Sequence, residues 1–296
     1  MNIFKIIQML EIFTKSVLWL GLVRRRGGRG ALGWSAGFCL AWAVSVSANA
    51  STTITVGGVG SITPLMQRLV QQYQAVEQGV QVQLVDPPIG STGGVRALAA
   101  GKLDVVVSGR PLRDNEAGLL QPWLRTPLVL ATQGGRLQGL DHDTLVQIFS
   151  GQRKTWDDGQ PLRLVIRGLF ESETQVLMAI SPAMKRALEQ SVNRHQALMA
   201  DNDLDAVAKL EKIRGSFGTT SLGLLKTTQS DLTVLPLQGR TPTLEALREG
   251  QYPWARPYFL VVRADATPAV QRFVAYLRSP AALDLVQRWG YLPSTR

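Results

Sequence analysis

From Ser51 to the C-terminus, short apolar strand patterns alternate with amphipathic helix patterns. Residues 54–56 and 80–85 predict strands. Thr63 and Pro64 begin a helix between them, because they supply an N-cap and a proline at the first helical position. This strand–helix–strand order predicts an α/β fold with a parallel, doubly wound sheet, whose loops gather at the carboxyl ends of the strands. The same alternation predicts strands at 103–107, 127–132, 162–167 and 232–237, and helices at 143–149 and 201–213.

The first fifty residues have the composition of an export signal. A basic cluster at 24–29 precedes an uncharged, mostly apolar run at 31–47, and Ala48 and Ala50 supply the small residues that a signal peptidase needs. We therefore predict that residues 1–50 are a signal peptide and that the chain is exported without stable membrane insertion. A retained anchor is the alternative, because 31–50 is long enough to span a bilayer. The stretch before the basic cluster is long for a signal, so a start codon downstream of Met1 also stays open.

The strongly basic charge of the chain belongs in large part to this segment. The formal charge is +10, and residues 1–50 hold six basic side chains and one acidic side chain. The rest of the chain carries 26 basic against 21 acidic side chains, scattered among one another and without an aromatic stacking motif. We therefore expect no nucleic-acid partner. The remaining surplus is sufficient to draw a small anion toward a cleft.

Cysteine and histidine usage excludes several kinds of chemistry. Cys39 is the only cysteine and would leave with the signal peptide, so the mature chain has no disulfide and no thiolate nucleophile. The two histidines, His142 and His195, lack the spacing of a zinc site. We expect no metal, no cofactor and no catalytic residue.

Three loops are suited to binding an oxyanion. Each places hydroxyl or glycine residues where a predicted helix begins, so backbone N–H groups point outward. These loops are 60–61, 90–94 and 171–174. Ser108 and Arg110 follow the strand at 103–107, and Arg167 ends another strand, where a guanidinium offers bidentate donation. Taken singly, each of these signals also fits ordinary helix capping.

Several of these segments, in this order, resemble the periplasmic phosphate-binding proteins of ABC importers. The matching segments are 54–61, 89–95, 103–112, 145–151, the Lys-x-Trp turn at 154–157 and the Tyr-Pro-x-x-Arg-Pro stretch that begins at Tyr252. The resemblance covers essentially all of 52–296. It implies two doubly wound α/β lobes, joined by crossing hinge strands, that close on a ligand as type II solute-binding proteins do. Lobe 1 would be 51–127 plus 256–296, and lobe 2 would be 128–255.

The resemblance also implies a function. We expect a periplasmic monomer that binds phosphate or a related oxyanion for an ABC permease, without catalysis. In the family, hydroxyl and N–H groups of both lobes and an arginine hold the anion. The corresponding candidate ligand-binding residues here are Ser61, Ile62, Ser91, Thr92, Gly93, Ser108, Arg110, Arg167, Ser172 and Thr174.

Two positions depart from the family pattern. Gly109 stands where the family has an aspartate that accepts a proton from the anion, and Glu173 replaces the glycine of a Ser-Gly-Thr helix start. A carboxylate beside a desolvated anion repels it unless an arginine pairs with that carboxylate. These departures leave a second interpretation open, in which the same fold has lost its ligand and serves as a periplasmic or secreted adaptor.

Overall fold

The computed structural model describes residues 51–193 and 197–294, so the predicted signal peptide at 1–50 lies outside the described residues. The strands are β1 (Thr52–Gly58), β2 (Val80–Leu84), β3 (Val105–Ser108), β4 (Leu119–Thr132), β5 (Arg163–Ile166), β6 (Leu198–Met199), β7 (Ser216–Ser221), β8 (Thr233–Leu235), β9 (Ala255–Val262) and β10 (Leu292–Pro293). The helices are η1 (Gly60–Ile62, a 3-10 turn), α2 (Thr63–Val76), α3 (Gly90–Ala99), α4 (His142–Ser150), α5 (Ser172–Met178), α6 (Pro182–Val192), α7 (Asp203–Lys212), α8 (Leu222–Thr228), α9 (Leu244–Arg248), α10 (Pro268–Leu277) and α11 (Pro280–Arg288).

The sheet is mixed rather than wholly parallel. Its strand order is β2-β1-β3-β9-β4-β7-β5-β6, with β8 and β10 each paired to β4. The predicted parallel arrangement holds for β1 with β2 and β3, and for β5 with β6 and β7. The antiparallel part arises from β9 and β4. Strand β9 lies between β3 and β4 and is antiparallel to both, and β4 is also antiparallel to β7, β8 and β10.

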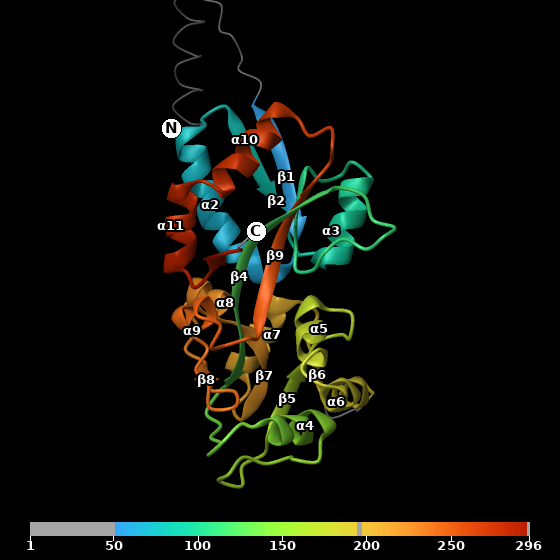
Figure 1. The fold of residues 1–296 in the computed structure, drawn as a ribbon, viewed down its shortest axis with the longest axis vertical. Helices are drawn as coiled ribbons and strands as arrows, with labels where there is room; N and C mark the ends of the chain where they lie inside the picture. Colours follow the sequence, from blue (N-terminus) through green and yellow to red (C-terminus); the bar gives the residue numbers. More distant parts are fainter. Residues whose placement is uncertain (1–50, 194–196, 295–296) are drawn as a thin grey trace, which may run out of the picture. The chain divides into compact units, whose positions relative to one another are not determined.

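Strand β4 continues from one part of the sheet into the other. Its first part, Leu119 to Pro127, pairs with β9, and its second part, Leu128 to Thr132, pairs with β7. The two long strands β4 and β9 lie side by side along their length (Figure 1). They correspond to the crossing strands that the resemblance implies, and they connect the two regions in which the core residues gather.

The apolar core is divided in the same way. The largest cluster of buried side chains, which includes Leu69, Tyr258 and Phe273, draws only on residues within 51–127 and 256–296. A second cluster, which includes Phe149 and Phe217, draws only on residues within 128–255. Two smaller clusters respect the same limits. The exact lobe boundaries stay a prediction, which this division of the core supports. Below, lobe 1 means residues 51–127 and 256–296, and lobe 2 means residues 128–255.

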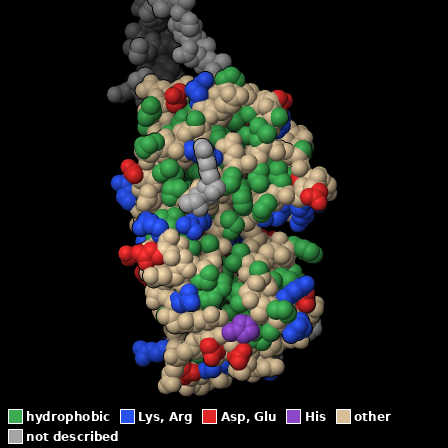
Figure 2. Space-filling model, viewed as in Figure 1, with side chains coloured by type: hydrophobic (Ala, Val, Ile, Leu, Met, Phe, Trp, Pro, Cys, Tyr) green, Lys and Arg blue, Asp and Glu red, His purple; other side chains and the backbone are tan. Residues whose placement is uncertain are grey.

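Charged side chains of both signs are mixed on the surface of the described residues. On the face drawn in Figure 2, Lys and Arg side chains are interspersed with Asp and Glu and form no continuous basic patch. Within 51–193 and 197–294, none of the helices combines the length and the apolar character that crossing a membrane requires.

Candidate functional site

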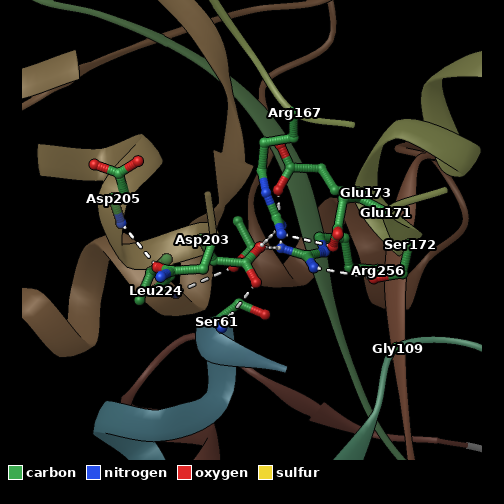
Figure 3. Close-up of polar contacts among 12 residues, drawn as sticks. Ser61, Gly109, Arg167, Glu171, Ser172, Glu173, Asp203, Asp205, Leu224 and Arg256 are labelled. Atoms are coloured by element: carbon green, nitrogen blue, oxygen red, sulfur yellow. Dashed lines mark hydrogen bonds and ion pairs between the residues drawn. The ribbon is translucent and has the colours of Figure 1, made fainter. Parts of the chain in front are cut away.

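Four buried charged side chains meet where the two lobes are in contact (Figure 3). We call Arg167, Glu173, Asp203 and Arg256 the buried ion cluster, and each of them is at most 6% exposed. Arg256 Nη1 lies 2.8 Å from Asp203 Oδ1 and 3.0 Å from Glu173 Oε2. Arg167 Nη1 lies 2.7 Å from the same Asp203 oxygen. Two guanidinium groups therefore share one aspartate.

The second oxygen of Asp203 contacts the other lobe. The backbone N–H of Ser61, in η1, donates a hydrogen bond of 3.1 Å to Asp203 Oδ2. Ser61 itself is fully buried. Tyr258 Oη donates a hydrogen bond to its Oγ and Tyr291 Oη donates one to its carbonyl oxygen, each at 3.0 Å. The loop that was predicted to hold an oxyanion thus donates to a carboxylate of the protein.

Local sequence explains how Asp203 reaches this place. Asn202 is the N-cap of α7, and its side chain accepts a hydrogen bond from the backbone N–H of Asp205. Asp203 is consequently the first residue of the helix, where a negative charge is favoured by the helix dipole. Asp205 points elsewhere and pairs with Lys209 at 2.6 Å.

The charges in the cluster are strongly perturbed. Burial by itself would raise the pKa of the Asp203 carboxyl, but Arg256, Arg167 and the Ser61 N–H together outweigh burial and hold that pKa at about 2. Burial raises the pKa of Glu173, the charge of Asp203 adds to this, and the two arginines oppose it. Burial disfavours the charged form of Arg256, yet the neighbouring carboxylates raise its pKa above the ordinary value. Asp203 is therefore an anion in the folded protein.

Two cavities adjoin this region. The larger one, of about 470 Å³, is lined from both lobes, and its lining includes Ser91, Thr92 and Arg110 from lobe 1 and Ser172 from lobe 2. The smaller one, of about 130 Å³, has Arg167, Asp203 and Gly60 among its lining residues. Residues predicted from separate loops thus come together around the larger cavity.

Arg110 is held in place beside the larger cavity by one carboxylate. Its two terminal nitrogens each lie 2.7 Å from an oxygen of Glu116, and Nη2 also donates to Thr92 Oγ1 at 3.2 Å. The hydrogen bonds from Arg110 lower the pKa of Glu116 to about 2, although burial opposes them. Ser91 Oγ accepts the backbone N–H of Gly109 at 2.9 Å, so this hydroxyl can still donate toward the cavity.

Other predicted site residues lie outside both cavities. Ser108 is fully buried and closes a turn, in which its Oγ donates to the Arg110 carbonyl oxygen at 2.6 Å. Ser61, Ile62 and Thr174 are buried, and Gly93 lies on α3 close to Ile89. Their roles as ligand contacts stay predictions, since these side chains do not line either cavity in the described part of the chain.

Both departures from the family pattern have a structural explanation. At Gly109, a β-carbon would lie 2.4 Å from Ser172 Oγ, so a larger side chain requires Ser172 to move. Glu173 points into the buried ion cluster and pairs with Arg256, and Glu171 pairs with Arg167 Nη2 at 2.6 Å. Each carboxylate therefore has an arginine partner.

Sequence reasoning missed two of the four cluster residues. Arg256 belongs to the Tyr-Pro-x-x-Arg-Pro stretch that was recognised as a motif, and an arginine within a predicted hinge strand was a usable signal of a buried partner. Asp203 gave no such signal, because it is one of three aspartates, 201, 203 and 205, at the start of a predicted helix. Acidic residues are common there for capping reasons alone.

A mixed α/β sheet crossed by two long strands, with a cavity lined from both lobes, defines the class of periplasmic-binding-protein folds. The chain belongs to the PBP superfamily, because the profile of the PBP superfamily domain matches residues 43–281. No curated protein matches the sequence significantly. The predicted fold class and family resemblance are confirmed.

Solved structures of the same fold are numerous but distant in sequence. One is a putative phosphate ABC transporter substrate-binding protein with bound phosphate from Clostridium perfringens, at 14% identity and a TM-score of 0.71, covering 82% of this chain and 100% of that chain. Another is an ABC-type phosphate transport receptor from Vibrio cholerae, at 20% identity and a TM-score of 0.61, covering 81% and 99%. A third is the substrate-binding domain of a putative molybdenum ABC transporter from Clostridium difficile, at 12% identity and a TM-score of 0.51, covering 83% and 100%. These similarities show the fold.

Proposed function

We propose that the chain is an exported solute-binding protein that captures a small anion, phosphate or a related oxyanion, for an ABC permease. The observation that carries this proposal is the larger cavity, where Ser91, Thr92 and Arg110 of lobe 1 face Ser172 of lobe 2. A solute held there would contact both lobes, which is how a two-lobed binding protein couples capture to closure. The solved structures of phosphate-binding relatives support the same class of ligand.

The electrostatics of the larger cavity favour an anion. Arg96 and Arg113 line it together with Arg110, against the single carboxylate of Glu171. The first residues of α3, Gly90 to Thr92, also line it, so the N-terminus of a ten-residue helix faces the cavity. Backbone N–H groups and the helix dipole at such an end both stabilise a negative charge.

Two serines, Ser91 and Ser172, line the larger cavity. Within the described residues, neither Ser91 nor Ser172 hydrogen-bonds a histidine. His142 instead contacts Asp143 and the N-cap serine Ser181, which do not line the cavity. Binding without chemical change of the solute is therefore the proposal.

Isothermal titration of the purified protein with phosphate, sulfate and molybdate tests this proposal. We expect heat of binding and a raised melting temperature with at least one of the three anions. The variant Arg96→Gln should weaken that binding about tenfold, since it removes one of the guanidinium groups that line the cavity. Arg263→Gln is the matched control, because Arg263 is an exposed arginine of lobe 1 that pairs with Asp265 away from the cavity. No heat and no melting shift with any of the three anions would contradict the proposal.

The alternative function, a ligand-less adaptor, is favoured by one observation. Asp203 already pairs with Ser61, Arg167 and Arg256, which keeps these donors from contacting a solute. Affinity capture from a periplasmic extract distinguishes the two functions. A solute-binding protein should retain a small anion and an ABC permease, whereas an adaptor should retain a different protein and no anion.

A further inference from the structure

The carboxylate of Asp203 is surrounded by the kinds of donor that proteins use to hold a bound anion. It accepts hydrogen bonds from the Ser61 N–H in η1 and from Arg256 on β9, and it forms an ion pair with Arg167, which follows β5. The donors thus come from both lobes, as they would for a solute enclosed between the lobes. Such a set of charge-assisted donors is the usual means by which a protein holds a desolvated oxyanion.

We propose that Asp203 is a tethered internal ligand that occupies the oxyanion position and thereby determines which solutes this protein accepts. The proposal deepens the proposed function, on which it rests for the assumption that the cleft takes anions. In this arrangement an inorganic oxyanion reaches Ser61, Arg167 and Arg256 only by displacing the Asp203 side chain. Inorganic phosphate and sulfate are consequently poor ligands of the wild-type central position.

Charge balance within the buried ion cluster supports this assignment. Its two guanidinium groups face the carboxylates of Asp203 and Glu173, and Arg167 also pairs with Glu171 through its other terminal nitrogen. A further anion in the same place would meet two like charges at short range, in an interior where such repulsion is poorly screened. Removing Asp203 leaves Arg256 paired with Glu173 and Arg167 paired with Glu171, so each arginine loses one of its two carboxylate partners.

A further donor and adjoining space exist beside the cluster. Arg167 is 6% exposed, and its Nε has no hydrogen-bond acceptor within the protein. Arg167 and Asp203 also line the smaller cavity, of about 130 Å³, together with Gly60. Replacing Asp203 with a smaller residue therefore joins this cavity to the space that the Asp203 carboxylate fills, and leaves unsatisfied donors around that space.

The tether gives Asp203 an advantage over a free anion. The side chain is attached to the capped first turn of α7, so its carboxylate stays near the donors without loss of translational freedom. Even flexible attachment gives a group an effective concentration on the order of millimolar, and a side chain on a fixed helix exceeds that value. A free oxyanion must bind more tightly than this to displace the tethered group.

The experiment compares the wild type with Asp203→Ala, Asp203→Asn and Asp205→Ala. Phosphate and sulfate binding is measured by isothermal titration and by the shift of the melting temperature. Asp203→Ala should bind at least one of the two anions tenfold or more tightly than the wild type. Asp203→Asn removes the charge but keeps the volume, so it should show no such gain. Asp205→Ala is the matched control, because Asp205 lies on the same turn of α7 but pairs with Lys209.

The outcomes separate this inference from the proposed function. Equal oxyanion affinity in the wild type and Asp203→Ala overturns the inference and leaves the proposed function intact. Phosphate or sulfate binding by Asp203→Ala alone, with none by the wild type, supports the inference, and the molybdate titration of the wild type then decides the proposed function. Absence of phosphate and sulfate binding in both proteins overturns the inference, and absence of molybdate binding by the wild type as well overturns the proposed function.

A folding defect does not prevent the test. Asp203→Ala leaves Arg167 and Arg256 with one carboxylate partner each, and an anion in the solution can take the place of the lost carboxylate during folding. Refolding is then followed by circular dichroism in the presence and absence of phosphate, sulfate and acetate. Recovery of the folded signal by these anions in Asp203→Ala, and not in Asp203→Asn, supports the inference. Failure of all three anions to restore Asp203→Ala overturns it.

Discussion

A β-carbon placed on Gly109 would lie 2.4 Å from the Oγ and 2.8 Å from the Cβ of Ser172. Gly109 follows β3 in lobe 1, and Ser172 begins α5 in lobe 2, so this close approach joins the two lobes at the edge of the larger cavity. The phosphate-binding proteins that the chain resembles have an aspartate at this position. Here a side chain fits only if Ser172 moves away from Gly109.

The first prediction concerns this contact. Gly109→Ala should lower the free energy of unfolding by about 1–3 kcal/mol, because the new methyl group forces Ser172 and α5 to move in a packed interface. Denaturant unfolding measures the change. Gly79→Ala is the control, since Gly79 is exposed and a β-carbon there meets no atom within 4 Å. An alanine at 109 as stable as the wild type would show that the lobes are not held this closely in solution.

The second prediction is a loss of stability in acid that depends on Asp203. The folded pKa of about 2 lies below the unfolded value of 3.8, so the ionised carboxylate stabilises the fold above pH 4, and this contribution disappears as the pH falls toward 2. The difference between wild type and Asp203→Asn should shrink by about 2 kcal/mol between pH 5 and pH 2. Denaturant unfolding across this range measures it. The exposed Asp114→Asn serves as the control, and a difference that stays constant with pH would contradict the prediction.

The third prediction concerns Glu173, whose pKa is shifted in the opposite direction to that of Asp203. Burial raises the folded pKa of Glu173 above its unfolded value, so the contribution of this carboxyl is present below about pH 4.5 and is lost as the pH rises through the folded pKa. Glu173→Gln keeps the shape without the charge. Its stability relative to the wild type should therefore increase from pH 4 to pH 8, as measured by thermal unfolding at each pH. A relative stability that falls over this range would mean that the pairing with Arg256 outweighs burial.

The fourth prediction concerns a buried hydroxyl near the crossing strands. Thr126 Oγ1 donates to the Gly290 carbonyl oxygen at 2.7 Å and accepts the Gly223 N–H at 3.0 Å, so it links β4 to α8 and to the segment before β10. Thr126→Val keeps the shape but leaves two buried backbone groups unpaired, which should cost about 1–3 kcal/mol. Denaturant unfolding tests this, with the exposed Thr53→Val as control. Equal losses at both positions would rule out a special role for Thr126.

Elements with a strong local pattern were predicted closely. The helix expected at 143–149 is His142–Ser150, begun by an Asp141 side chain that accepts the Thr144 N–H, and the helix expected at 201–213 is Asp203–Lys212. The strand expected at 127–132 is the second part of β4, which begins earlier, at Leu119. The first part was missed because it contains Pro122 and Arg125 and depends on pairing with β9, a strand more than a hundred residues away.

For this protein, sequence alone determined the features that depend on neighbouring residues. Helix starts, strand periodicity and the loops at the strand ends follow from capping, side-chain alternation and backbone preferences within a few positions. Those same rules placed Ser91, Thr92, Arg110 and Ser172 at the edge of one sheet, and the tertiary structure brings them around one cavity.

Only the tertiary structure determines which acceptor pairs with the N–H and guanidinium donors of Ser61, Arg167 and Arg256. Ser61 and Asp203 are 142 residues apart, and Arg256 is 53 residues beyond Asp203 and 83 beyond Glu173. No local pattern links such residues, because a buried charge is stable only when packing removes water and brings its partner within contact distance. The sequence predicts loops suited to an anion, and the folding of the two lobes together places the Asp203 carboxylate against the N–H group of one of these loops.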